Sequence, residues 1–164
     1  MSRRAILKAA IKERQAGKPA EEVYKTYQGQ VRPNSALAMA IASVADPERK
    51  RRYAVLNYIL VALLVLNGLG NLMLGGVLFG LCMLVFAFAV ARFDGRVYPL
   101  LFLVILIGLP NIFVGEEGSW FLKLLDLIPY AVIIAVAFVA QRKIFPNMGP
   151  FGVKKSADGS YSWR

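Results

Sequence analysis

Two charged side chains stand inside an otherwise apolar stretch near the C-terminal end of the sequence. Lys123 and Asp126 lie three residues apart and are the only charged residues of the run 120–140. At this spacing both groups share one helix face and can pair with each other. Inside a membrane span, such a pair would mark an ion path or a contact with a partner helix. The alternative is an interfacial helix over 119–128 that turns both charges towards water, with the span beginning near Pro129.

Asparagine amides are the next polar groups within or beside apolar runs. Asn57 lies one turn inside the first run, and Asn111 lies near the end of the third. An amide that faces lipid is costly, so we expect Asn57 to hydrogen-bond to another helix, with substrate binding as the second interpretation. Asn67 and Asn71 are predicted to lie in a turn.

The composition excludes several kinds of catalytic and metal site. The sequence has no histidine, and its one cysteine, Cys82, lies inside an apolar run. Histidine bases, Cys–His pairs, disulfides within the chain and Cys-rich zinc sites are therefore excluded. The acidic residues are scattered, and no nucleotide-binding glycine motif is present. We therefore predict no enzyme activity, no cofactor and no metal ion.

The elements that would position these groups follow from where charges are missing. Of the 164 residues, 57% are apolar, and residues 53–91 contain no charged side chain. Soluble domains are usually about 45–50% apolar, so the excess indicates a membrane protein. The apolar runs predict four transmembrane helices, at about 53–70, 72–91, 97–114 and 120–144. The expected fold is all-α, a polytopic membrane protein built as a four-helix transmembrane bundle over residues 47–144.

A small region of short helices is predicted to precede the bundle, over residues 1–46. Apolar residues recur there at helical spacing, and Gly17 and Gly29 separate the segments. Asp46-Pro47-Glu48 is a strong N-terminal signal for the helix that leads to the first span. After the bundle, residues 145–164 form a tail with a predicted hairpin turning at Asp158-Gly159. The alternative for the tail is a disordered terminus.

Small residues at helical spacing predict close packing between helices. Gly76 and Gly80, with Gly75 beside them, follow the spacing that lets two helix backbones approach. Ala131 and Ala135 repeat the spacing on the fourth span. We expect these residues to pack within the bundle, and a dimer seam is the second interpretation.

Basic residues predict the orientation in the membrane. The chain has 20 Lys and Arg against 10 Asp and Glu, and the basic residues alternate between segments as four spans require. The N-terminus and the C-terminus are therefore expected in the cytoplasm of a bacterial-type inner membrane. Six basic residues would lie at its surface and meet anionic lipid headgroups: Arg49, Lys50, Arg51, Arg52, Arg142 and Lys143. This placement accounts for the net charge of +10 without nucleic-acid binding.

Two functions remain after these exclusions. The first is protein–protein interaction in the bilayer, with a protein partner or a homo-oligomer, through helix faces rich in small residues. In size and span count, the chain is similar to the membrane-embedded immunity proteins of pore-forming bacteriocins. That likeness is one of architecture and implies an immunity or accessory protein for a membrane-active toxin or a larger complex. The second is a small oligomeric transporter or channel subunit that uses Lys123 and Asp126.

Overall fold

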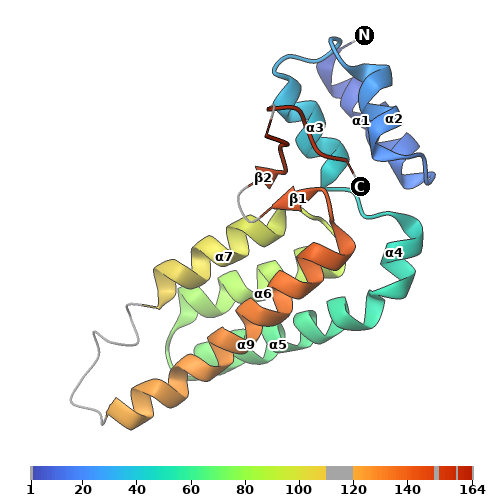
Figure 1. Ribbon diagram of the computed structural model, residues 1–164. Coiled ribbons are helices and arrows are strands. Elements are labelled where there is room, and N and C mark those ends of the chain that lie inside the picture. Colours follow the sequence, from blue (N-terminus) through green and yellow to red (C-terminus); the bar gives the residue numbers. More distant parts are fainter. Residues whose placement is uncertain (1, 110–119, 150–151, 158, 164) are drawn as a thin grey trace.

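The computed structural model describes residues 2–109, 120–149, 152–157 and 159–163 of the chain. Across these residues the protein is all-α apart from one short strand pair, as the sequence predicts. Three helices lie at one end of a group of four others (Figure 1). We call α1, α2 and α3 the cap, and α5, α6, α7 and α9 the bundle; α4 connects them.

The cap consists of α1 (Arg3–Gln15), α2 (Ala20–Tyr27) and α3 (Asn34–Ala42). The Ser2 hydroxyl caps α1 by accepting a hydrogen bond from the Ala5 amide at 3.4 Å. Gly17 follows this helix with a φ of 92°, a conformation that favours glycine. Apolar side chains from all three helices and the chain between them form a separate core: Ile6, Ala10, Val23, Val31, Leu37 and Ile41.

The connecting helix α4 (Pro47–Arg52) carries the basic cluster. Asp46 caps it by accepting a hydrogen bond from the Glu48 amide at 3.0 Å, as the Asp-Pro-Glu signal predicts. The helix does not run straight into the first apolar helix, because regular structure breaks at Tyr53 before α5 (Ala54–Met73) begins. α4 and α5 therefore meet at a corner (Figure 1).

α5 and α6 (Val77–Ala91) form a hairpin that turns at residues 74–76. The turn expected at 67–71 is wrong, because these residues belong to α5. Asn71 Nδ2 donates to Asn67 O within the helix at 2.8 Å. This hydrogen bond gives the Asn71 amide a partner inside α5, although the residue type favours a turn. Gly75 breaks the chain instead, with a φ of 85°.

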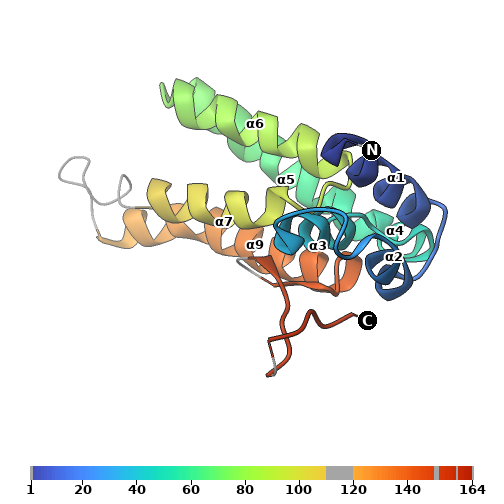
Figure 2. The same ribbon diagram turned by 90° about the horizontal axis from the view of Figure 1, so that it is seen from above.

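The other two bundle helices are α7 (Val97–Gly108) and α9 (Trp120–Ile144). The structure describes the α9 side chains except those of residues 121–123 and 125. One stripe of α9 is buried against the bundle core: Ile133, Ala137, Ala140 and Ile144. Seen from above, α5 with α6 and α7 with α9 form two pairs that diverge away from the cap (Figure 2).

Two of the described helices are long and apolar enough to cross a membrane, α5 and the Asp126–Ile144 part of α9. α6 has 15 residues and α7 has 12. At about 1.5 Å per residue these are shorter than the ~30 Å hydrocarbon core of a bilayer. Two such helices are a weak indication of a membrane protein, so the four-span bundle stays a prediction. Residues 110–119, which include the expected end of the third span, lie outside the described residues.

The C-terminal tail packs on the cap. Its strands, β1 (Met148–Gly149) and β2 (Gly152–Val153), form a short antiparallel pair that the sequence did not predict. Beyond them one isolated bridge pairs Lys155 with Tyr161, around the predicted turn, of which Asp158 lies outside the described residues. The Tyr161 and Trp163 rings lie 5.4 and 5.2 Å from the ring of Tyr24 on α2. These ring contacts supply the packing that a two-stranded hairpin needs.

Candidate functional site

The junction between the cap and α4 is held by a largely buried ion pair. Arg14 on α1 is 6% exposed, and its Nη1 donates to Asp46 Oδ2 at 3.1 Å and to Lys18 O at 2.8 Å. Partial burial raises the pKa of the Asp46 carboxyl, but hydrogen bonds from Arg14 and the Glu48 amide outweigh this effect and hold the pKa below its ordinary value. Because Asp46 also caps α4, one carboxylate both starts this helix and ties it to the cap.

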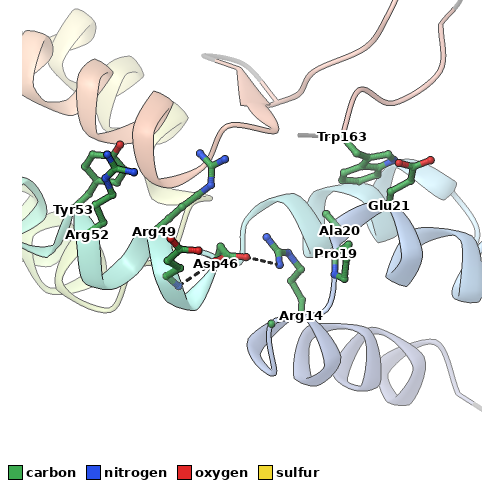
Figure 3. Close-up of a pocket in the computed structure, with 11 residues that line it drawn as sticks. Arg14, Pro19, Ala20, Glu21, Asp46, Arg49, Arg52, Tyr53 and Trp163 are labelled. Carbon is green, nitrogen blue, oxygen red and sulfur yellow. Dashed lines mark hydrogen bonds and ion pairs between the residues drawn. The ribbon is translucent and has the colours of Figure 1, made fainter.

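A polar cavity of about 580 Å³ opens beside this ion pair. Figure 3 shows Arg52 and Tyr53 on one side, Glu21 and Trp163 on the other, and the contact between Arg14 and Asp46 between them. Basic and acidic residues line the cavity in equal number: Arg14, Arg49 and Arg52 with Glu21, Asp46 and Glu48. The cavity has neither an excess of charge nor a nucleophile beside a base, so its lining offers no catalytic set.

The six predicted surface cations gather at the end of the bundle that faces the cap. Arg49, Lys50, Arg51 and Arg52 form most of α4, and Arg142 and Lys143 lie in the last turn of α9. Arg49 Nη1 donates to Lys143 O at 3.4 Å, which joins the two groups. The Arg142 guanidinium stacks 4.2 Å from the ring centroid of Phe138. Residues far apart in the sequence therefore share one basic rim.

Asn57 lies in a buried polar network that joins three bundle helices. Its Nδ2 donates to Val90 O on α6 at 2.9 Å, and its Oδ1 accepts from the Tyr98 hydroxyl on α7 at 2.9 Å. Both side chains are fully buried. The amide is thus bonded to other helices, as expected. Because its nitrogen and its oxygen both have partners and the side chain is fully buried, it connects the helices and is not accessible to a substrate.

The predicted charge pair, Lys123 and Asp126, lies only partly within the described residues. The side chain of Lys123 and the whole of Asn111 lie outside the described residues. Asp126 is exposed, although it continues the helix face of the buried Ile133 and Ala137. Among the described residues, the bundle interior is apolar except for the Asn57 network and, at the end nearest the cap, Gln141, whose Nε2 donates to Gly149 O. A polar path through the interior of one chain therefore has no support among the described residues.

Small residues pack where α5 meets α6, but not all the predicted ones take part. A Cβ added at Gly80 would lie 2.7 Å from Gly68 O, so the two backbones approach closely there. Gly75 and Gly76 belong to the turn instead. Ala131 and Ala135 are exposed on the outer side of α9, so the described residues do not bury them as expected.

Comparison with known proteins adds no assignment to this geometry. The chain matches no protein-family model, no curated protein and no solved structure. Within the described ranges, no three Cys, Asp or Glu side chains are close enough to hold a metal ion. The fold and the junction together define a helical bundle with a charged cap, and its function has to follow from its surfaces.

Sequence reasoning missed three of the residues that matter most at these contacts. Arg14 lies in the region for which the sequence predicts only short helices, yet it is buried against Asp46. Tyr98 and Gly68 were read as parts of a span and of a turn. Tyr98 carried a usable signal, because a phenol in an apolar run needs a hydrogen-bond partner as much as an amide does.

Proposed function

We propose that the protein is a four-span protein of a bacterial-type inner membrane, with the cap and both termini in the cytoplasm. The two ends of the chain lie at the same end of the bundle (Figure 1), which an even number of crossings requires. Basic residues flank that end and are missing from the opposite turn at 74–76. Basic loops are retained in the cytoplasm, so this distribution supports the orientation.

The outer surface of the bundle supports a lipid environment. Large apolar side chains are exposed along three of its helices: Val55, Ile59, Leu66 and Met73; Leu78, Leu81, Val85 and Phe88; Leu100, Leu103, Leu106 and Ile107. In water, each exposed side chain would cost about 25 cal/mol of free energy for every Å² of apolar surface that it leaves unburied. A bilayer removes this cost, and it explains why no charged residue interrupts positions 53–91.

Single-cysteine labelling tests the topology. Cys82→Ala removes the native thiol, and Ser119→Cys or Ser160→Cys then introduces one on either side of α9. We expect a membrane-impermeant maleimide to label residue 119 from outside intact cells, and residue 160 only after permeabilisation. Labelling of both positions from the same side would contradict the four-span topology.

We propose that the protein acts by lateral contact with another protein in the bilayer. The observation that carries this proposal is that Ala131 and Ala135 face outwards, one turn apart, on α9. Small residues at this spacing let the backbone of a second helix come close, and in the described part of the chain both alanines are left exposed. An apolar transmembrane helix of a partner, or α9 of a second copy, fits this surface.

Photocrosslinking in native membranes tests the contact. A photoreactive amino acid in place of Val132, which is exposed beside the two alanines, should give discrete adducts. Ala131→Leu with Ala135→Leu should abolish them, whereas Ala62→Leu on the exposed face of α5 should not. Two differently tagged copies distinguish a homo-oligomer from a partner. Adducts that survive the double substitution would refute this surface.

Within this proposal, an immunity or accessory protein for a membrane-active toxin or a larger complex is the specific form that we retain. Co-expression with the product of the neighbouring gene tests it, because protection should preserve the membrane potential and should require Ala131 and Ala135. For the transporter alternative, the purified protein in liposomes should show no ion flux. A flux that Asp126→Asn removes would favour the transporter instead.

A further inference from the structure

A second cavity, of about 700 Å³, shares no lining residue with the one beside Arg14. Three parts of the chain build it: α1, residues 43–50, and the end of α6 with the following turn. The Gly95 amide donates to Ser43 O at 3.1 Å, and Arg96 Nε donates to Ser43 Oγ at 3.2 Å. These bonds fix the 92–96 turn against the end of α3, so the cavity has a defined wall.

The charges that line this cavity are unbalanced. Lys50, Arg92 and Arg96 face a single carboxylate, Asp94. Asp94 Oδ1 accepts the backbone amide of Arg96 at 3.0 Å, and none of the three cations forms an ion pair in the described part of the chain. An excess of two positive charges in one cavity favours an anionic ligand.

Aromatic rings hold two of these cations in place. Lys50 Nζ lies 4.9 Å from the ring centroid of Phe93, and the Arg92 guanidinium lies 4.4 Å from that of Phe88. Phe93 adopts a φ of 57°, in the left-handed region that bulky side chains rarely enter. Such strain is kept where surrounding contacts enforce it, and here it places a buried ring beneath Lys50.

The cavity also has an apolar side that leads towards the outer surface of α6. Phe88 and Ala89 line it, and Phe88 is 61% exposed on the same outward surface as Val85 and Leu81. Cations and an apolar wall thus meet at the end of the bundle that carries the basic rim. A ligand that fits both must have an anionic head and a hydrocarbon part.

We propose that this cavity binds one anionic phospholipid of the inner leaflet. Lys50, Arg92 and Arg96 neutralise its phosphate, and the first part of an acyl chain follows Phe88 and Ala89. This inference rests on the proposed membrane placement. A bound headgroup would contact the cap, α4 and α6 together, so the lipid would stabilise the docking of the cap on the bundle.

Native mass spectrometry of the full chain tests this site. The protein is reconstituted into vesicles of equal parts phosphatidylglycerol and phosphatidylcholine, then released in mild detergent, and the retained lipid is counted. We expect one phosphatidylglycerol per protein. Lys50→Gln with Arg92→Gln should lower its retention about tenfold, which corresponds to about 1.4 kcal/mol. Arg51→Gln, which removes a charge from the same helix outside the cavity, should retain the lipid.

The outcomes separate this inference from the proposed function. Failure of the protein to enter vesicles, or its release by alkaline carbonate, would refute the membrane placement. Two results would refute the lipid site but leave the membrane placement standing. The first is full insertion with equal retention of phosphatidylglycerol and phosphatidylcholine. The second is an equal loss of phosphatidylglycerol in the Lys50→Gln/Arg92→Gln variant and in Arg51→Gln. Release of the lipid by inorganic phosphate would assign the cavity to a free anion. Lys50→Arg with Arg92→Lys should restore retention, and circular dichroism verifies that each variant is folded.

Discussion

The cap and the bundle are both packed helices, yet different contacts hold them together. The three ion pairs of the described residues all lie in the cap or at its junction with α4: Arg14–Asp46, Lys18–Glu13 and Lys25–Glu21. In the bundle core the polar contacts are between uncharged groups, where Tyr98 donates to Asn57 and Asn57 donates to Val90 O. The proposed membrane placement accounts for this difference, because water supports charged contacts around a small apolar core, whereas lipid favours close backbones and neutral hydrogen bonds.

The largest loss of stability is expected when a side chain fills the space where two bundle helices approach. Gly80→Ala places a Cβ 2.7 Å from Gly68 O and 2.8 Å from Leu72 Cγ, so α5 and α6 must separate. We expect a loss of about 3 kcal/mol in the free energy of unfolding, measured by denaturant titration in micelles. Gly70→Ala is the matched control, because no atom lies within 4 Å of its added Cβ. Equal losses in the two variants would contradict backbone packing as the main bundle contact.

The corresponding change in the cap breaks its buried ion pair. Arg14→Met leaves the Asp46 carboxylate without its partner, and we expect a loss of about 2 kcal/mol, less than for a fully buried pair because Asp46 is 27% exposed. Hydrogen exchange of the α1 amides should accelerate, while that of α5 and α6 stays unchanged. Lys25→Met removes an ion pair on a side chain that is 70% exposed. It should change neither the free energy of unfolding nor the exchange of the α1 amides. Faster exchange in α5 as well would show that the cap and the bundle unfold as one unit.

Removing the neutral hydrogen bond of the bundle should have a smaller effect. Tyr98→Phe leaves Asn57 Oδ1 buried without the hydroxyl that it accepts from, and we expect a loss of about 1 kcal/mol in the same titration. Tyr58→Phe serves as control, since Tyr58 is 58% exposed, and should have no effect. A loss from Tyr98→Phe as large as that from Gly80→Ala would reverse the order proposed for the bundle contacts.

Acidification should weaken the cap alone and by the smallest amount. Because the pKa of the Asp46 carboxyl is lowered in the folded chain, its contribution to stability is complete well above the ordinary pKa of an aspartate and is lost as the pH falls through the lower, folded value. Exchange of the α1 amides should therefore accelerate between pH 5 and 3, relative to those of α5. Asp46→Asn keeps an oxygen to cap α4 but has no carboxyl to protonate, so the excess acceleration in α1 should become smaller. The remainder comes from Glu13 on α1, whose carboxyl pKa is lowered by hydrogen bonds from Lys18 and Tyr27. An unchanged difference would exclude this carboxylate as its source.

Local signals account for most of the helices. Asp46-Pro47 caps α4 as predicted, and apolar runs coincide with α5, α6, α7 and α9, of which only α9 contains charged residues inside the run. The turn was misplaced because Asn67 and Asn71 are turn formers by type, whereas here they bond to each other along α5. Composition alone cannot foresee that Gly68 opposes Gly80, since that contact joins residues on two helices. The sequence likewise located Asn57 and the basic rim, but not their partners.

The sequence by itself determined that the protein is helical, where its charges lie relative to its apolar segments, and which residue types are available for chemistry. Only the tertiary structure decided which face of each apolar helix points inwards. α6 is apolar on every side, so the spacing of its apolar residues does not indicate which face is buried. The inward face is set by the neighbours that pack on it. The same packing left Ala131 and Ala135 outside and brought Lys50, Arg92 and Arg96 around one cavity. Those two surfaces come from three-dimensional contacts between distant segments, which no local pattern records.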